Sequence, residues 1–192
     1  MYRSIQTAVA LLIVSAATPA LAGDFDYNYL EAGWLHTGLT SDHETGDGFD
    51  VAGSAALGAN YHAFAQVGDQ DFGHGFRLYT YEVGAGFNRS LASGLDLVGN
   101  ASYVRGQNDV HGAPNFTDEG WSLAMQLRGQ LAEQVELDGG IKYTDLHQAG
   151  SATTFNIDGL FFLAKNLTAI AGLSFNDQGN VLRLGVRYSF GN

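Results

Sequence analysis

The sequence predicts an all-β protein: a closed antiparallel transmembrane β-barrel of ten strands, with eight strands as the alternative. Three observations lead to this fold class. Apolar and polar residues alternate with a period of two along almost the whole chain, and no helical period is present. The connections between the alternating segments are short and long in turn. Aromatic residues gather near the two ends of the apolar face of these segments.

The first segment of the chain, residues 1–22, is predicted to be a cleaved secretory signal peptide. Arg3 is followed by a short apolar run around residues 8–14 and then by an Ala-x-Ala sequence that ends at Ala22. The alternative, an N-terminal membrane anchor, needs about 18 or more apolar residues, and this run is shorter. Residues 23–192 are then expected to form a single barrel domain.

The composition of the exported part excludes several classes of protein. Cleavage removes one of the nine basic residues and none of the 20 acidic residues, so the mature chain is strongly acidic and no nucleic-acid partner is expected. The chain has no cysteine, so disulfide bonds do not hold the fold together. Its 26 glycines and two prolines fit neither collagen nor disorder, because the glycines lie inside alternating segments.

Each predicted strand has one apolar and one polar face. In the segment 119–131, for example, Trp121 and Leu123 alternate with Ser122 and Ala124. The ten predicted strands are residues 27–37, 49–58, 60–68, 76–88, 95–105, 119–131, 135–144, 153–163, 167–175 and 181–190.

The lengths of the connections predict how the barrel is oriented. Short turns are expected at residues 58–60, 89–94, 132–134 and 164–166, and longer loops at 38–48, 69–75, 106–118, 145–152 and 176–180. Outer-membrane barrels carry short turns on the periplasmic side and longer loops outside. An even number of strands therefore predicts that both termini lie in the periplasm.

A soluble barrel has the same alternation with its apolar face inward, so the two arrangements must be distinguished by other features. The rings on the apolar face are sorted to the strand ends, and mainly aliphatic residues lie between them. Two such rings are typical of the interfacial girdles of a membrane barrel. At the loop ends the predicted girdle consists of Trp34, Phe49, Tyr79, Tyr103, Trp121, Tyr143, Phe155 and Phe175; at the turn ends lie Tyr61, Phe87, Phe161, Tyr188 and Phe190.

The opposite face carries charged residues near the middle of several strands. Acidic and basic side chains are present in equal number, which fits an enclosed interior because an unpaired buried charge is costly. The predicted lumen cluster consists of Glu31, Glu82, Asp138, Asp158, Arg128, Lys142, Arg183 and Arg187.

The last predicted strand has the form polar-x-Gly-x-x-aromatic-x-aromatic, with Gly185, Tyr188 and Phe190 at the defining positions. This pattern resembles the C-terminal signal by which the bacterial barrel-assembly machinery selects outer-membrane proteins, although Gly191 and Asn192 follow the usually terminal Phe. The chain as a whole resembles the small OmpA/OmpX-like outer-membrane barrels of Gram-negative bacteria. It is similar to a subgroup with "YNYLEAGWL" (27–35) and "LGVRYSF" (184–190), some members of which are labelled quorum-sensing or immune-eliciting proteins. The resemblance implies a cell-outer-membrane location and no catalytic residues.

The predicted long loops are acidic and contain no Lys or Arg. A rim of this kind would attract divalent cations and lipopolysaccharide phosphates bridged by them, or it would simply be a solvated surface, which we favour. Neither a calcium-loop spacing nor a histidine spacing that fixes a transition metal is present, so no cofactor and no defined metal site are predicted. The acidic residues are Asp42, Glu44, Asp47, Asp69, Asp71, Asp109, Asp118, Asp145 and Asp177, and the nearby histidines are His36, His43, His74, His111 and His147.

These features predict a structural or interaction protein of the cell surface, with a role in envelope integrity, adhesion or host contact. A narrow porin-like channel for small ions or solutes is the alternative. A surface lipid A-modifying enzyme or protease would use Ser, His and acidic residues of the segment 41–47, with His36 and His147 near the same strand ends. It is a weaker hypothesis, because a polar loop contains such residue types by chance. We therefore expect no enzyme activity.

Overall fold

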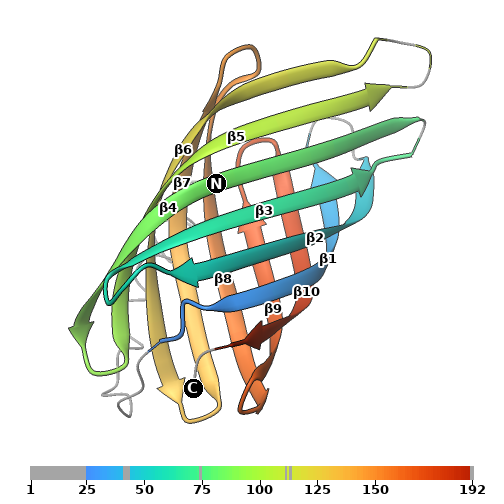
Figure 1. Cartoon of the computed structure of the whole chain (residues 1–192). Helices are drawn as coiled ribbons and strands as arrows, with labels where there is room; N and C mark the ends of the chain where they lie inside the picture. Colours follow the sequence, from blue (N-terminus) through green and yellow to red (C-terminus); the bar gives the residue numbers. More distant parts are fainter. Residues whose placement is uncertain (1–24, 41–43, 74, 111, 113, 191–192) are drawn as a thin grey trace.

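The computed structural model describes residues 25–40, 44–73, 75–110, 112 and 114–190. The predicted signal peptide lies outside these residues. Within the described part of the chain, ten strands follow one another without a helix (Figure 1). They are β1 (Tyr29–Leu39), β2 (Thr45–Ala56), β3 (Tyr61–Asp71), β4 (Phe76–Ala92), β5 (Leu95–Val110), β6 (Phe116–Ala132), β7 (Val135–Leu146), β8 (Gly150–Ala164), β9 (Leu167–Phe175) and β10 (Gly179–Ser189).

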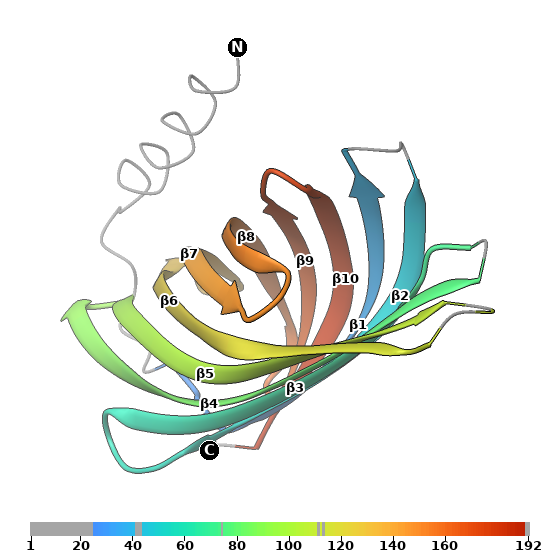
Figure 2. The same ribbon diagram turned by 90° about the horizontal axis from the view of Figure 1, so that it is seen from above.

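The strands form one closed antiparallel barrel, as Figure 2 shows from above. Each strand pairs with the next one along the chain, and β1 closes the ring by pairing with β10 from Tyr29↔Ser189 to Leu39↔Gly179. Closure leaves no unpaired strand edge, which is the requirement for a sheet that crosses a lipid bilayer. The predicted closed barrel of ten strands is confirmed, and the alternative of eight strands is wrong.

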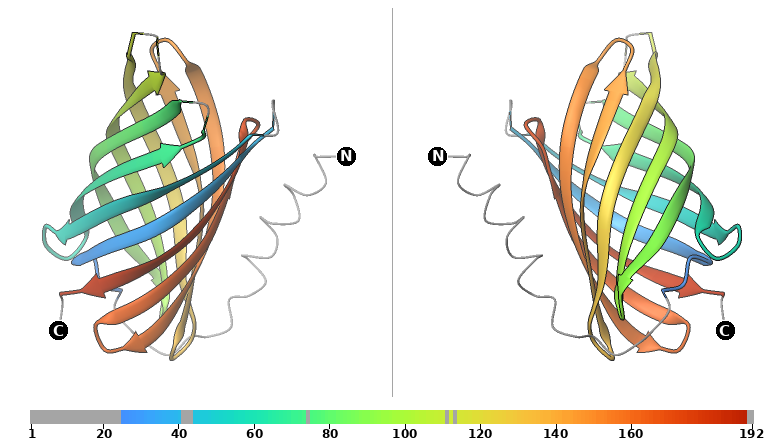
Figure 3. Two further views of the ribbon diagram at one scale, coloured as in Figure 1. Left: turned by 90° about the vertical axis from the view of Figure 1, so that its right-hand side faces the viewer. Right: turned by 90° about the vertical axis from the view of Figure 1, so that its left-hand side faces the viewer.

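The barrel is taller on one side than on the other. The strands β4, β5 and β6 contain 17, 16 and 17 residues, whereas β9 and β10 contain 9 and 11 (Figure 3). The predicted strands 95–105 and 119–131 both continue further toward the long-connection end than expected. This continuation is polar on both faces around Arg105–Asn108, so it carries no apolar alternation that would reveal it in the sequence.

The two ends of the barrel differ in their connections. At one end, which we name the turn end, β2–β3, β4–β5, β6–β7 and β8–β9 are joined by short turns. Gly58 (φ 104°) and Gly94 (φ 70°) adopt left-handed backbone conformations in two of these turns, which glycine does without steric penalty. At the opposite end, which we name the loop end, the connections contain three to five residues, compared with two to four at the turn end. The loops predicted at 38–48, 69–75, 106–118, 145–152 and 176–180 are therefore shorter than expected, because the strands continue into them.

Burial in this barrel is inverted relative to a soluble protein. Leu184, Val186, Leu123, Met125 and Leu173 on the outer wall are 47–53% exposed. Acidic, basic and hydroxyl side chains make up most of the buried residues, among them Glu31, Asp50, Glu136 and Arg128. Large apolar side chains exposed on the outer wall of every strand pair fit the hydrocarbon of a bilayer. In the described part of the chain, no helix has the length and apolar character needed to cross a membrane.

Candidate functional site

The turn half of the lumen contains a tightly packed cluster of charges. Arg128 on β6 places Nη2 2.6 Å from Oε1 of Glu136 on β7, and its Nε lies 3.6 Å from Oδ2 of Asp138. Arg187 on β10 donates to Glu31 on the neighbouring strand β1 at 2.6 Å, and its Nη1 lies 3.9 Å from Glu136. All five residues are buried, so the cluster crosses the lumen between β1–β10 and β6–β7.

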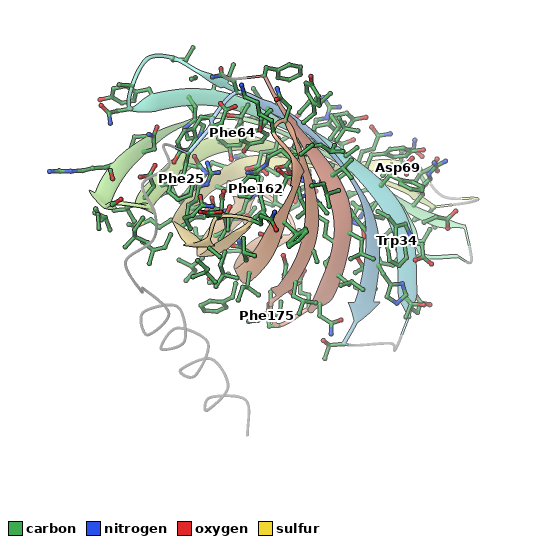
Figure 4. The ribbon with its side chains drawn as sticks, turned by 90° about the horizontal axis from the view of Figure 1, so that it is seen from below. Phe25, Trp34, Phe64, Asp69, Phe162 and Phe175 are labelled. Atoms are coloured by element: carbon green, nitrogen blue, oxygen red, sulfur yellow. The ribbon has the colours of Figure 1, made fainter. Side chains whose placement is uncertain are left out.

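The residues just before β1 fold into the lumen and cover this cluster. The rings of Phe25 and Tyr27 each lie 4.8 Å from the guanidinium carbon of Arg128. The Tyr27 hydroxyl donates to Asp96 on β5 at 2.9 Å, and its ring stacks on His62 of β3. Figure 4, which views the barrel from below, shows Phe25 inside the ring of strands. We name residues 25–28, with the side chains they cover, the plug.

Burial is the main reason why the pKa of Tyr27 lies well above its ordinary value. The neighbouring Asp96 carboxylate raises it further, and Arg128 opposes the shift. The hydroxyl therefore stays protonated and keeps donating to Asp96 across the physiological pH range. Tyr29, the first residue of β1, adds a further ring 4.3 Å from the guanidinium carbon of Arg187.

A second ion-pair group spans β1 in the middle of the lumen. Arg183 on β10 reaches over β1 to Asp50 on β2, with its Nη2 3.0 Å from Oδ2 of Asp50 and 2.9 Å from Oε2 of Glu31. The intervening residue on β1 is Gly33, where a Cβ atom would lie 2.5 Å from Asp50 and 2.9 Å from the Arg183 guanidinium. The absence of a side chain at Gly33 is therefore what permits this bridge.

The opposite wall carries a separate polar group. Lys142 on β7 pairs with Glu82 on β4 across the two strands between them. Ser102 on β5 donates to Glu82 at 2.6 Å and lies 2.6 Å from Ser122 on β6. Glu82 is thus held by hydroxyls as well as by the lysine, and the Lys142 side chain remains 31% exposed.

Asp158 completes the predicted lumen cluster but forms no close ion pair with it. Its Oδ2 accepts a long hydrogen bond of 3.4 Å from the Asn156 amide on the same strand, β8. Gly172 on β9 leaves the space for this carboxylate, because a Cβ atom there would clash with Oδ1. The structure thus brings the other seven predicted lumen residues into ion pairs, whereas Asp158 lies beside the Asn156 amide.

Between these groups the lumen contains a hollow of about 300 Å³, which we name the chamber. Toward the turn end, the chamber is bounded by Tyr27 of the plug and by Arg128 and Asp138 of the charge cluster. Toward the loop end, Gln66 on β3 faces the lumen, and its exposure shows that water reaches this part of the interior. The chamber is therefore closed at the turn end and water-accessible toward the loop end. Its four acidic lining residues, Glu31, Glu82, Asp138 and Asp158, are balanced by four basic ones, Arg128, Lys142, Arg183 and Arg187.

The predicted girdle residues lie on the outer wall. Trp34 and Phe49 face each other across β1–β2, Tyr103 faces Trp121 across β5–β6, and Trp121 packs against Tyr143 at 5.5 Å. Figure 4 shows Trp34 and Phe175 outside the ring. The remaining members are Tyr79, which lies under Arg77 at 5.1 Å, and Phe155, which stacks on Phe175 at 6.1 Å.

The residues of the predicted assembly signal lie on the seam that closes the barrel. Gly185 on β10 faces Gly33 on β1, and a Cβ atom at Gly185 would lie 2.7 Å from the Ala32 carbonyl oxygen. Tyr188 and Phe190 point outward at the turn end with their rings edge to face, 5.2 Å apart.

Several of the loop acids serve local structure. Asp118 accepts backbone N–H groups of Gln148 and Ala149 in the β7–β8 connection, at 3.1 and 2.7 Å. Burial would raise its pKa, but these N–H donors and that of Glu119 outweigh it and lower the pKa below the ordinary value. Asp69 forms a bidentate pair with Arg77, and Asp47 lies 2.9 Å from His36. No three His, Asp or Glu residues of the described chain come together as a metal site.

The residues invoked for the enzyme hypothesis are not brought together where they can be described. His36 on β1 pairs with Asp47. The ring of His147, which directly follows β7, contacts the backbone carbonyl of Glu119 on β6. Ser41, Asp42 and His43 lie outside the described residues, as do His74 and His111.

Some important lumen residues are absent from the predicted cluster. Asp50, Asp96 and Glu136 are buried partners of Arg183, Tyr27 and Arg128. Asp50 and Glu136 lie on the polar face of alternating segments, so a strict application of the period of two would have identified both. His62, the one histidine outside the predicted loops, is buried beside the plug.

Comparison with known proteins identifies only the fold. No family model matches the chain, and no curated protein matches it by sequence. Among solved structures, the chain is similar to a NanC porin, with a TM-score of 0.54, 8% identity, and coverage of 84% of this chain and 100% of the other. A KdgM porin (TM-score 0.49, 16% identity) and Neisserial surface protein A (TM-score 0.43, 16% identity) each match 84% of this chain, and 99% and 96% of their own.

The closed ten-stranded ring, the apolar outer wall and the enclosed charges define a transmembrane β-barrel of the outer-membrane class. The similarity to the NanC porin supports the same fold. The cell outer membrane is the location of proteins with this architecture.

Proposed function

We propose that this protein is a structural and interaction barrel of the cell surface, whose lumen is closed in the resting state. The observation that carries this proposal is the plug. Phe25 and Tyr27 lie over Arg128, and the buried pair of Arg128 and Glu136 joins them to the strand wall. A lumen filled by ion pairs and rings at one end does not provide a continuous aqueous path.

In this proposal the turn end and both termini face the periplasm, and the loop end faces outward. The acidic loops then form the outer surface, and they contact lipopolysaccharide directly or through divalent cations. The rigid, closed wall holds these loops in fixed positions, which suits envelope integrity, adhesion or host contact. The role is non-catalytic.

The test is single-channel recording of the folded mature protein in planar bilayers. We expect no stable conductance steps from the unmodified protein. Reproducible large steps would contradict a closed lumen.

A companion test asks whether the acidic loops act at the cell surface. A strain that lacks the protein is complemented with the unmodified chain, or with a chain carrying Asp71→Asn, Asp109→Asn and Asp177→Asn. We expect only the unmodified chain to restore resistance to detergent and adherence. Equal complementation by the neutralised chain would contradict the role of the loops.

A narrow channel is a second candidate, because the loop half of the lumen is already hollow. It requires that the plug moves. In the variant with Phe25→Ala and Tyr27→Ala we expect small steps to appear in the same bilayers. We also expect them to prefer cations, because the buried acids Asp50, Asp96 and Glu136 lie behind a lining of balanced charge. Identical recordings from variant and unmodified protein would exclude the plug as the element that closes the lumen.

A further inference from the structure

The chamber has the form of a cup. Plug residues and the charge cluster around Arg128 close it at the turn end. Gln66 and Lys142 on its wall are accessible from the loop end. Its volume of about 300 Å³ lies at the lower end of the range of small-molecule pockets, about 300–1,000 Å³. A compound that enters from outside therefore meets a blind site with room for a single small ring.

Seven of the eight charged residues on the chamber wall are paired with each other, and Asp158, which accepts a hydrogen bond from Asn156, is the exception. Lys142 is paired with Glu82, and Arg183 is paired with Glu31 and Asp50. An anionic ligand would lose its hydration shell without gaining an unpaired basic side chain, and it would compete with existing pairs. A cationic ligand would compete with the same pairs and would find one acid, Asp158, outside them. This arrangement favours an uncharged ligand.

The chamber also offers polar groups that have no partner. Within the part of the chain that the structure describes, the side-chain amide of Gln126 on β6 and the hydroxyl of Ser174 on β9 form no hydrogen bond, and both line the chamber. The carboxamides of Gln66, Asn100 and Asn156 lie around the same hollow, each engaged through one described side-chain hydrogen bond. An amide presents both donors and an acceptor, which is what adjacent hydroxyl groups of one molecule require.

One face of the chamber is aromatic. Phe64 on β3 lines it beside His62, with 6.1 Å between the two ring centroids, and Figure 4 shows Phe64 on the inner side of the ring of strands. A flat apolar surface opposite several amides suits a ligand with one C–H face and a hydroxylated rim.

We propose that the chamber binds a small, uncharged, polyhydroxylated molecule of the size of a monosaccharide or cyclic polyol. Gln126 and Ser174 supply the free hydrogen-bonding groups, and Phe64 supplies the apolar face. The site goes beyond the proposed surface role, since ligand can occupy the chamber while the plug keeps the lumen closed.

The experiment measures binding to the purified, folded protein in detergent by isothermal titration calorimetry. The neutral probes are glucose, galactose and myo-inositol, and the charged counterparts are glucuronate and glucosamine. We expect saturable binding of at least one neutral probe, about tenfold tighter than that of its charged counterparts, because one desolvated charge outweighs one neutral hydrogen bond. Tighter binding of a charged probe, or no saturable binding of any neutral probe, overturns the proposal.

Two matched pairs of variants locate the site. Gln126→Leu removes the free amide and should weaken binding about five- to tenfold, whereas Gln107→Leu makes the same change on the outer face of β5 and should leave it unaltered. Ala124→Leu fills the chamber without removing a polar group and should abolish binding, whereas Ala101→Leu on the outer wall should not.

Heat-modifiable gel migration shows whether each variant has folded. Ser174→Ala is a milder change that should weaken binding if Ala124→Leu does not fold. Binding that persists unchanged in the folded chamber variants overturns the proposed site. Bilayer recordings measure whether the lumen is closed, and calorimetry measures ligand binding in the chamber. The failure of the closed-lumen proposal therefore does not imply the failure of the ligand-site proposal, or the reverse.

Discussion

The lumen is filled at the turn end and hollow toward the loop end, although the same ten strands form both halves. In the turn half, Arg128 and Glu136 have side chains that are 6% and 3% exposed, and two aromatic rings cover the arginine. In the loop half, the Lys142 side chain of the pair with Glu82 is 31% exposed and borders the chamber. An ion pair enclosed by protein and one in contact with water thus occur within one barrel.

This difference determines what each half contributes. Removing one partner of an enclosed pair leaves a charge that neither water nor protein stabilises, so the enclosed pair makes the turn half sensitive to mutation. A pair in contact with water tolerates the same change, because water replaces the missing partner. We therefore assign stability and closure to the turn half and exchangeable contacts to the loop half.

The largest expected effect is that of Arg128→Ala. The change leaves Glu136 buried without its main partner, and it should lower the free energy of unfolding by about 3–5 kcal/mol. The measurement is urea unfolding in lipid vesicles, followed by gel migration.

The matched control for this prediction is Lys142→Ala in the loop half. Ser102 and Ser122 continue to hold Glu82, so the expected loss is about 1 kcal/mol or less. Equal losses from the two variants would contradict the contrast between the halves.

The sequence shows which face of each strand is enclosed, but it does not show which charges meet. Arg183 and Asp50 are 133 positions apart, and their pairing depends on the register of β1 with both β2 and β10. Alternation with a period of two has the same form for every register, so it placed Arg183 in the lumen and left its partner undetermined. The outward face of the predicted girdle residues could likewise be read from the period of two, because it does not depend on register.

The plug could not be predicted from periodicity at all. Phe25 and Tyr27 precede β1, although the predicted strand 27–37 included Tyr27, and their contact with Arg128 joins segments about a hundred positions apart. A feature of the sequence that could have drawn attention to them is the density of aromatic residues at positions 25, 27 and 29, all with the parity of the lumen-facing Glu31. Such a density has no explanation if these rings face water.

A smaller effect, which sharpens the role of the plug, is expected for Tyr27→Phe. The ring stays, but Asp96 loses the hydrogen bond from the hydroxyl while it remains buried, so the free energy of unfolding should fall by about 1–3 kcal/mol.

The same variant should also change the alkaline response. Because the pKa of Tyr27 is raised in the folded protein, its contribution is fully present below the ordinary tyrosine pKa of about 10 and is lost as the pH rises above it. The unfolding midpoint of the unmodified barrel should fall as the pH rises above about 10, and that of the variant should fall less. A variant that is as alkali-sensitive as the unmodified protein would mean that another group governs this transition.

The smallest effect is expected at the loop end, from Asp118→Asn. The carboxylate accepts backbone N–H groups of the β7–β8 connection, so the change should loosen residues 147–149 and leave the barrel folded. Cleavage of this connection by an added protease should increase several-fold, with the gel migration of the folded barrel unchanged. Since the folded-state pKa of Asp118 is lowered, its contribution is present above the ordinary aspartate pKa of about 4 and is lost as the pH falls through the lower folded value. Acidification of the unmodified protein should therefore reproduce the loosening seen in the variant at neutral pH. If the variant instead unfolds as a whole, the loop half contributes to global stability, and the division between the two halves of the lumen does not hold.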